Sequence, residues 1–148
     1  MKIVTIIGAR PQFMKSIMFS KALKGHEEVV IHTGQHYDEN MSRIFFEELG
    51  MEKEDYNLDI NQGSHAEQTG KMMIKIEKIL LDEKPDYVVV FGDTNSTIAG
   101  ALAASKIQIP IVHVEAGFRS HDMKMPEEVN RIVTDRISTI LFCPTRLA

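Results

Sequence analysis

The sequence predicts an α/β fold in which a doubly wound parallel sheet forms a Rossmann-like domain. Apolar runs such as Tyr87–Phe91 and Ile111–Val114 are continuous rather than alternating, which is typical of strands covered on both faces. These runs alternate with helix-like segments, and repeated strand–helix–strand order implies right-handed crossovers. No repeat, low-complexity segment or linker interrupts the 148 residues, so we expect one domain over 1–148.

The strands are predicted from runs rich in Val and Ile. Lys2–Ile7 indicates a buried first strand rather than a signal peptide, because a single lysine precedes the run and Gly-Ala-Arg-Pro follows it. The run near Tyr56–Leu58 is the weakest. The expected strands are Lys2–Ile7, Val29–Thr33, Tyr56–Leu58, Tyr87–Phe91, Ile111–Val114 and Ile140–Phe142.

The helices are predicted from start and stop signals together with periodicity. Pro11 suits a first helical turn, Gly50 a C-terminal stop, and Ser64 with Glu67 forms a capping-box pattern. The expected helices are Met14–Leu23, Glu39–Leu49, a helix after Ser64 with Met72, Ile76, Ile79 and Leu80 on one face, Ser96–Lys106, and Glu127–Ser138.

Composition and charge narrow the classes of function. A net charge of −4 and a pI near 5.9 argue against nucleic acid as a main partner, since phosphate backbones select basic surfaces. No apolar run approaches the roughly 20 residues that cross a bilayer, so no membrane partner is expected. The lone Cys143 allows no intramolecular disulfide and fits a reducing, cytoplasmic compartment. The nine methionines are expected to fill the core.

The topology also predicts where a ligand binds. In open parallel sheets, ligands bind beyond the carboxyl ends of the strands, where the strand order reverses. With the usual order 3-2-1-4-5-6, this point lies between the first and fourth strands. The segments GARPQFMK, after Ile7, and GDTNST, after Phe91, should therefore face one crevice.

The first of these segments is predicted to bind an anion. Gly8 permits a tight turn, Arg10 is a permanently charged fork, and the following helix start adds a positive dipole end. Lys15 adds a point charge one turn further on. A generic strand–helix turn with a solvated arginine is the alternative. The segment lacks both G-x-G-x-x-G and a Walker loop, so no nicotinamide cofactor is expected.

Two carboxylates follow neighbouring predicted strands. Asp93 comes one residue after a buried strand, beside Gly92, and Glu115 ends the next strand. Carboxylates so close together are typical of a site that contains both an acid and a base. The alternatives are structural: Asp93 as a plain helix N-cap, and Glu115 in a salt bridge with Arg119.

A second acidic pair, Glu127 and Glu128, opens the last predicted helix after Pro126. Helix dipoles favour acids in a first turn, which is the structural alternative. Asn130 and Arg131 lie three and four residues after Glu127, so we expect them on the same face, where they could orient Glu127.

The histidines give weaker signals. His32 and His36 are four residues apart, a metal-ligand spacing on a helix, but they fall at a strand end and in a loop, so no metal site is expected. His113 alternates with Glu115 and should face the same side of the strand. Surface or capping positions are expected for His26, His65 and His121.

Five segments in this order carry a resemblance to a known family: IGARPQFMK, HTGQHYD, GDTNST, HVEAGFRS and MPEEVNR. They resemble the N-terminal half of the non-hydrolysing UDP-N-acetylglucosamine (UDP-GlcNAc) 2-epimerases, and the match runs over essentially the whole chain. The wider first segment is similar to the branch that acts on UDP-2,3-diacetamido-2,3-dideoxyglucuronic acid in O-antigen synthesis.

The resemblance implies the N-terminal domain of a GT-B type fold, a UDP-sugar substrate, no cofactor, and elimination of UDP followed by its re-addition. It assigns catalysis to Asp93, Glu115 and Glu127, and substrate binding to the cations Arg10 and Lys15. Further expected substrate-binding residues are Gln35, His36, Asn130 and Arg131.

The resemblance also sets limits on what these residues do alone. Family members run on for about as long again, with a second half that carries most UDP contacts and a further catalytic histidine. We therefore expect the 148 residues alone not to epimerise, and expect a homodimer or assembly with such a half. Gln35-His36 continue with Tyr37-Asp38, which departs from the allosterically regulated members.

Two other functions stay open at this stage. The first is a non-catalytic nucleotide-sugar-binding module that serves assembly. The second is a metallophosphoesterase, suggested by Gly92-Asp93 after a strand, although the expected downstream Gly-Asn-His-Asp type motif is missing.

Overall fold

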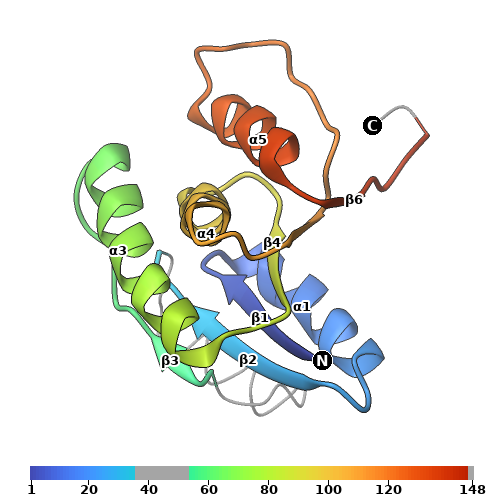
Figure 1. Ribbon diagram of the computed structural model, residues 1–148. Helices are drawn as coiled ribbons and strands as arrows, with labels where there is room; N and C mark the ends of the chain where they lie inside the picture. Colours follow the sequence, from blue (N-terminus) through green and yellow to red (C-terminus); the bar gives the residue numbers. More distant parts are fainter. Residues whose placement is uncertain (36–53, 147–148) are drawn as a thin grey trace.

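A parallel six-stranded sheet, with strands in the order β3-β2-β1-β4-β5-β6, organises the molecule (Figure 1). The computed structural model describes residues 1–35 and 54–146. The strands are β1 (Lys2–Ile7), β2 (Glu27–His32), β3 (Tyr56–Asn57), β4 (Tyr87–Phe91), β5 (Ile111–Val114) and β6 (Ile140–Phe142); the helices are α1 (Arg10–Ala22), α3 (His65–Glu83), α4 (Asn95–Lys106) and α5 (Pro126–Ile137).

The predicted strand order and the doubly wound topology are confirmed. β1, β4, β5 and β6 have the predicted bounds, whereas β2 begins two residues earlier than expected and β3 is shorter. The expected helix Glu39–Leu49 lies outside the described residues. The observed order places the reversal point between β1 and β4, as the sequence predicted.

Helix α1 begins at Arg10, four residues before the predicted start. The side chain of Gln12 makes the early start possible, because its Oε1 accepts hydrogen bonds from the backbone N–H groups of Gly8 (2.8 Å) and Ala9 (3.0 Å). Pro11 occupies the first turn, where no N–H is needed. A side chain thus replaces the missing helical partners at this end.

The core consists of two apolar layers, one on each face of the sheet. Val4 and Ile6 of β1 pack into the layer below α3 and α4, and Ile3 and Ile7 pack into the layer below α1. Helices α3, α4 and α5 lie on one face, and α1 lies on the other (Figure 1). This two-sided burial explains why the strand sequences are apolar without alternation.

The helices on the first face pack by two different means. Helix α3 buries Met72, Ile76 and Leu80 along one face, as predicted, with Ile79 partly buried beside them. Helix α4 is buried over most of its length because its side chains are small. Within the described chain, no helix is both long and apolar enough to cross a membrane.

The prediction that the methionines fill the core is wrong for most of those described. Met72 is fully buried and Met73 packs against the core, but five others are exposed. They lie in α1, in the loop before α5, or at the N-terminus: Met1, Met14, Met18, Met123 and Met125. Periodicity identifies which face of α3 is buried, but not which methionines are.

Two glycine substitutions should change stability in opposite directions. A Cβ at Gly8 would lie 2.0 Å from Ser96 Oγ and 2.3 Å from Thr33 Oγ1, whereas a Cβ at Gly70 within α3 meets nothing within 4 Å. Gly8→Ala should destabilise the fold by about 1–3 kcal/mol through overpacking. Gly70→Ala should stabilise it by about 0.5–1 kcal/mol because alanine restricts the unfolded chain and favours the helix.

Urea unfolding followed by circular dichroism measures both changes. An unaltered midpoint for Gly8→Ala would contradict the close approach of β1 to the first turn of α4.

Candidate active site at the carboxyl edge of the sheet

The carboxyl-terminal ends of strands β1, β4 and β5 lie side by side at one edge of the sheet. Phe91 pairs with Val114 in the β4–β5 register, so Asp93 and Glu115 follow neighbouring strand ends. Arg10, the first residue of α1, starts from the same edge after β1; its side chain lies outside the described part of the structure. The sequence therefore placed these residues on the correct edge.

Two glutamines, Gln12 of α1 and Gln35 after β2, connect this edge of the sheet to the start of α4 by hydrogen bonds. Gln12 donates from Nε2 to the carbonyl oxygen of Phe91 at 2.7 Å and to Thr94 Oγ1 at 3.1 Å. Gln35 accepts at Oε1 from the backbone N–H of Ser96 (3.1 Å) and from its hydroxyl (2.7 Å). The first turn of α4 is thus held from α1 and from the segment after β2. His36, another expected ligand-binding residue, lies outside the described residues.

Glu115 pairs with Lys15 of α1, not with Arg119 as the structural alternative expected. Both side chains are about a third exposed, so the pair faces solvent at the mouth of the site. Glu115 has a φ of 69°, in the left-handed region that disfavours residues with a Cβ. A strained backbone thus holds this carboxylate, a pattern common at functional sites.

Asp93 is held from α5 and does not cap α4. Thr94 is the N-cap of that helix, and its side chain accepts from the backbone N–H of Thr97. Arg131 donates from Nη2 to Asp93 Oδ2 at 2.6 Å, and Asn130 Nδ2 donates to the Asp93 carbonyl oxygen at 2.9 Å. The plain N-cap alternative for Asp93 is therefore wrong.

The two acids of α5 have different surroundings. Glu128 is 1% exposed, and Arg131 pairs with it rather than with Glu127, which corrects the expectation that Asn130 and Arg131 orient Glu127. Glu127 is half-buried and forms no ion pair with any described residue.

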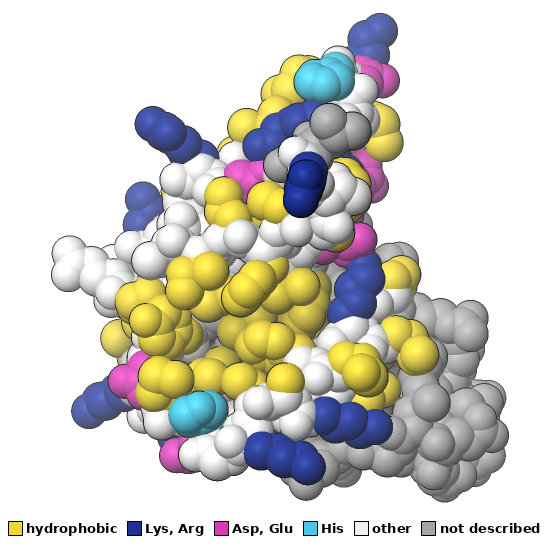
Figure 2. Space-filling model, turned by 90° about the vertical axis from the view of Figure 1, so that its right-hand side faces the viewer, with side chains coloured by type: hydrophobic (Ala, Val, Ile, Leu, Met, Phe, Trp, Pro, Cys, Tyr) yellow, Lys and Arg dark blue, Asp and Glu magenta, His cyan; other side chains and the backbone are white. Residues whose placement is uncertain are grey.

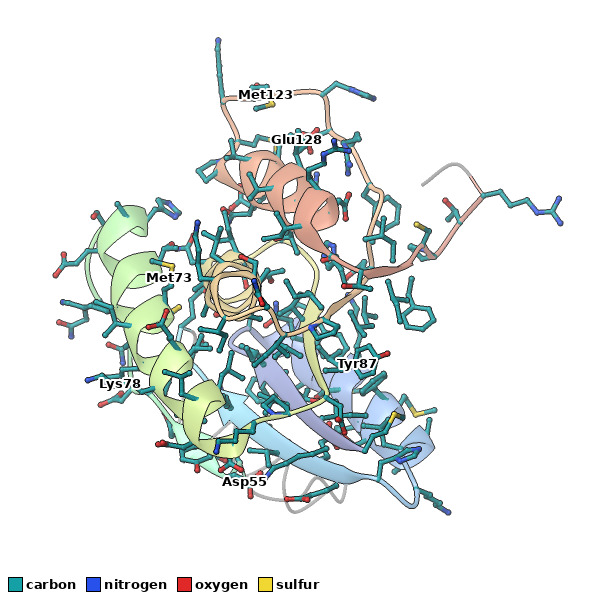
Figure 3. All side chains as sticks on the ribbon, viewed as in Figure 1. Asp55, Met73, Lys78, Tyr87, Met123 and Glu128 are labelled. Carbon is teal, nitrogen blue, oxygen red and sulfur yellow. The ribbon has the colours of Figure 1, made fainter. Side chains whose placement is uncertain are left out.

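Glu128 holds the loop that joins β5 to α5. Its Oε2 and Oε1 accept the backbone N–H groups of Ser120 and His121, each at 3.0 Å. The N–H of Ser120 is the largest influence lowering the pKa of Glu128; burial opposes it, and His121 and Arg131 add to the lowering. Figure 3 shows Glu128 between α5 and the loop that carries Met123.

A second buried acid, Asp135, holds the same loop nearer to Glu115. Its Oδ2 accepts from Arg119 at 2.6 Å and from the backbone N–H of Gly117 at 3.1 Å. Its Oδ1 lies 2.7 Å from His113 Nδ1, and the other ring nitrogen of His113 lies 2.7 Å from the carbonyl oxygen of Gly92. The ends of β4 and β5 are thus joined beneath the site.

This arrangement corrects the expected position of His113. His113 is fully buried and contacts α5, whereas Glu115 contacts Lys15 of α1 on the opposite side of the sheet. The alternation of side chains stops at Glu115 because its φ is positive. His26 and His121 are exposed as predicted, and the exposed His65 contacts Asn95.

The contacts of Gln12 and Asp135 and the distinct surroundings of Glu128 were not predicted from the sequence. One signal was present, because Asp135 follows Glu128 by seven residues and so lies on the same helical face. The signal for Gln12 was its place at the third position of α1, where a Gln side chain can bind the cap backbone, although Ala9 rather than Ser or Thr occupies the cap.

A cavity of about 250 Å³ opens beside the Lys15–Glu115 pair. Val114, Phe142, Cys143 and Pro144 supply its other walls. It lies toward the face that bears α1 and the C-terminal segment, where hydrophobic side chains line a broad hollow (Figure 2). The site therefore combines an ion pair with an apolar wall.

Comparison with known proteins identifies the family of this chain. Residues 21–148 match the family described as UDP-N-acetylglucosamine 2-epimerase. The chain belongs to the UDP-N-acetylglucosamine 2-epimerase family. Its fold is the Rossmann-like domain of these epimerases, and its expected GT-B-like character is confirmed.

Two curated epimerase-family relatives match the whole chain. A UDP-2,3-diacetamido-2,3-dideoxy-D-glucuronate 2-epimerase of Pseudomonas aeruginosa is 61% identical, and the chain covers 43% of it. A UDP-N-acetylglucosamine 2-epimerase homolog of Methanococcus maripaludis is 64% identical, with 42% covered. The chain thus spans about two-fifths of the length of these relatives.

A solved structure of the family gives the same result for the fold. The UDP-GlcNAc 2-epimerase of Methanocaldococcus jannaschii, in complex with UDP-GlcNAc and UDP, superposes with a TM-score of 0.95 at 56% identity. The superposition covers 99% of this chain and 41% of that one.

Two substitutions at Glu115 should separate backbone strain from charge. Glu115→Gly and Glu115→Ala both remove the carboxylate, but only glycine tolerates a φ of 69° without strain. The glycine variant should therefore be more stable than the alanine variant by about 1 kcal/mol. Chemical denaturation of both variants gives the difference directly, and equal stability would argue against a strained Glu115.

Stability should depend on pH through Glu128. Because its pKa is lower in the folded state, the Glu128 carboxylate contributes stability in full above about pH 4.3, the value in an unfolded chain. That contribution is lost as the pH falls through the folded-state value.

Urea titrations between pH 3 and 6 should therefore show a shallower acid loss of stability in Glu128→Gln than in the wild type. Ile76→Val serves as the control, because it alters the core without changing a titratable group, and it should keep the wild-type slope. Identical slopes for wild type and Glu128→Gln would contradict the expected linkage.

Proposed function

We propose that residues 1–148 form the N-terminal catalytic half of a UDP-sugar 2-epimerase that interconverts UDP-GlcNAc and UDP-N-acetylmannosamine. The observation that carries the proposal is that Asp93 and Glu115, each paired with a cation, follow the neighbouring strands β4 and β5, next to the point where the strand order reverses. Family membership supports the reaction class, and the M. jannaschii relative was solved with UDP-GlcNAc and UDP.

The proposed reaction begins with removal of a proton from C2 of the sugar. A carboxylate takes the proton, the electron pair of the C2–H bond forms a C1–C2 double bond, and the C1–O bond breaks, with its electrons leaving on UDP. A proton then adds to C2 from the opposite face while an oxygen of UDP re-forms the bond to C1. Atoms and charge balance without a redox cofactor.

The described residues fit the requirements of this sequence. It needs a base, an acid on the other face of the sugar, and cations for the charge that develops on the departing pyrophosphate. Asp93, Glu115 and Glu127 are the candidate acids and bases, and Lys15, with Arg10, supplies positive charge. Glu127 suits such a role because it has no ion-pair partner in the described structure.

We also propose that residues 1–148 carry only part of the active site. The relatives are more than twice as long, and we propose that a C-terminal half provides most contacts to UDP and that two such chains form a homodimer. We propose that Gln35, which follows β2, contributes to substrate binding, and the family resemblance adds His36 as a further candidate. A cytoplasmic location fits the exposed, unpaired Cys143.

A second candidate substrate is UDP-2,3-diacetamido-2,3-dideoxyglucuronic acid. The observation that favours it is the 61% identity to the P. aeruginosa relative of that specificity. A non-catalytic nucleotide-sugar-binding module is the remaining alternative, and it predicts binding without turnover.

A chimera tests the function. Residues 1–148 would be joined to the C-terminal part of the M. jannaschii enzyme and assayed with both UDP-sugars in D₂O. We expect inversion at C2 with deuterium incorporated at that carbon, because the abstracted proton exchanges with solvent. Asp93→Asn and Glu115→Gln should each reduce kcat by about 10²–10⁴-fold while the circular dichroism spectrum is unchanged.

The matched control is Glu67→Gln. Glu67 and Lys71 form another glutamate–lysine pair, located in α3, and its removal should leave kcat unchanged. Wild-type turnover in Glu115→Gln would overturn the catalytic assignment. A chimera that binds either UDP-sugar by calorimetry, yet turns over neither, would support the binding module instead.

A further inference from the structure

Glu128 has a set of contacts that the proposed chemistry does not explain. It is a charged side chain with 1% exposure at the start of α5. A helix dipole alone favours an exposed acid there and does not require burial. A buried carboxylate must be compensated, and Glu128 is compensated from outside its own helical turn by the N–H groups of Ser120 and His121.

These contacts fix the middle of the loop between two candidate catalytic acids. The loop starts after Glu115 and ends just before Glu127. The N–H groups of Ser120 and His121 are consecutive, and both point at the same carboxylate. Without that acceptor, two partly buried backbone donors would lose their partner, and the loop would adopt other conformations.

Arg131 extends the same network to Asp93. Its Nη1 contacts Glu128, and its Nη2 lies 2.6 Å from Asp93 Oδ2. Because the guanidinium is planar and rigid, fixing one nitrogen against Glu128 also fixes where the other meets Asp93. Arg131 is only 12% exposed, and both its terminal nitrogens are occupied, so it acts as a spacer between two acids.

We propose that Glu128 is a positioning residue that acts through Arg131 on Asp93 and through the loop amides on the segment between Glu115 and Glu127. This inference deepens the proposed function and rests on it for its catalytic part. It also gives Arg131 a positioning role instead of the substrate contact that the motif suggested. Asn130 reinforces the arrangement by binding the backbone of Asp93.

The inference separates two adjacent glutamates by role. Glu127 is half-buried, forms no ion pair with the described residues and is the candidate that meets substrate, whereas the buried oxygens of Glu128 are occupied by Ser120, His121 and Arg131. A small displacement of a catalytic group costs up to about 10²-fold in rate. Loss of Glu128 should therefore impair catalysis although Glu128 never touches the sugar.

The first experiment needs no activity. Hydrogen exchange of the Ser120 and His121 amides would be followed by NMR in the 148-residue chain. Glu128→Gln should accelerate exchange at these two amides by about tenfold or more, because hydrogen bonds to a charged acceptor are among the strongest. Glu127→Gln should leave them unchanged, and Ile76→Val, in the core under α3, controls for general loss of stability.

The second experiment measures kcat and KM separately in the chimera. Glu128→Gln should lower kcat by about 10–100-fold and change KM by less than about threefold, whereas Ile76→Val should change neither. A double-mutant cycle with Asp93→Asn gives the decisive readout. If Glu128 acts through Arg131 on Asp93, the combined variant should be scarcely slower than Asp93→Asn alone.

The outcomes distinguish this inference from the proposed function. If the wild-type chimera is inactive but Glu128→Gln accelerates amide exchange, the proposed epimerase function would be refuted. The role of Glu128 in holding the loop amides of Ser120 and His121 would stand. An active chimera with unchanged exchange and unchanged kcat in Glu128→Gln would overturn the positioning role. Fully additive effects in the cycle would also overturn it, because they would show that Glu128 does not act on Asp93.

Discussion

The site depends on the anchoring of an irregular loop by two buried carboxylates of α5. Glu128 and Asp135 lie on one helical face, and together they bind the backbone of Gly117, Ser120 and His121. A loop of this length has many backbone groups that no regular structure satisfies. Glu128 and Asp135 accept hydrogen bonds from three of these backbone N–H groups. Helix α5 therefore determines where the residues at both ends of the loop are placed.

The fold class and the edge that carries the site follow from local rules that the sequence obeys closely. Continuous apolar strands, the Ser64 cap and the small residues of α4 each indicate one structure, and right-handed crossovers then leave few possible strand orders. The early start of α1 could not be predicted in the same way. It depends on Gln12 at the third helical position, whose side chain accepts from the backbone N–H groups of Gly8 and Ala9 as in half of a capping box. The signal is obscured because Ala9, rather than Ser or Thr, stands at the cap.

The pairing of charges was harder to predict than their location. Sequence spacing suggested Arg119 for Glu115 and Arg131 for Glu127, but the observed partners of the two acid-binding arginines are Asp135 for Arg119, and Glu128 with Asp93 for Arg131. The change at Glu115 follows from its positive φ, which turns its side chain toward α1. One backbone angle therefore changes the partner of Glu115, and periodicity carries no information about that angle.

The two acids that end neighbouring strands are held from opposite sides of the sheet. Lys15 approaches Glu115 from α1, whereas Arg131 and Asn130 approach Asp93 from α5. A reaction that removes a proton from one face of a carbon and returns it to the other needs two groups that do not compete for one position. Independent supports on opposite helices meet that requirement, because each carboxylate can keep its own position when the other changes charge. This separate support is the feature of the edge on which the proposed two-face proton transfer would depend.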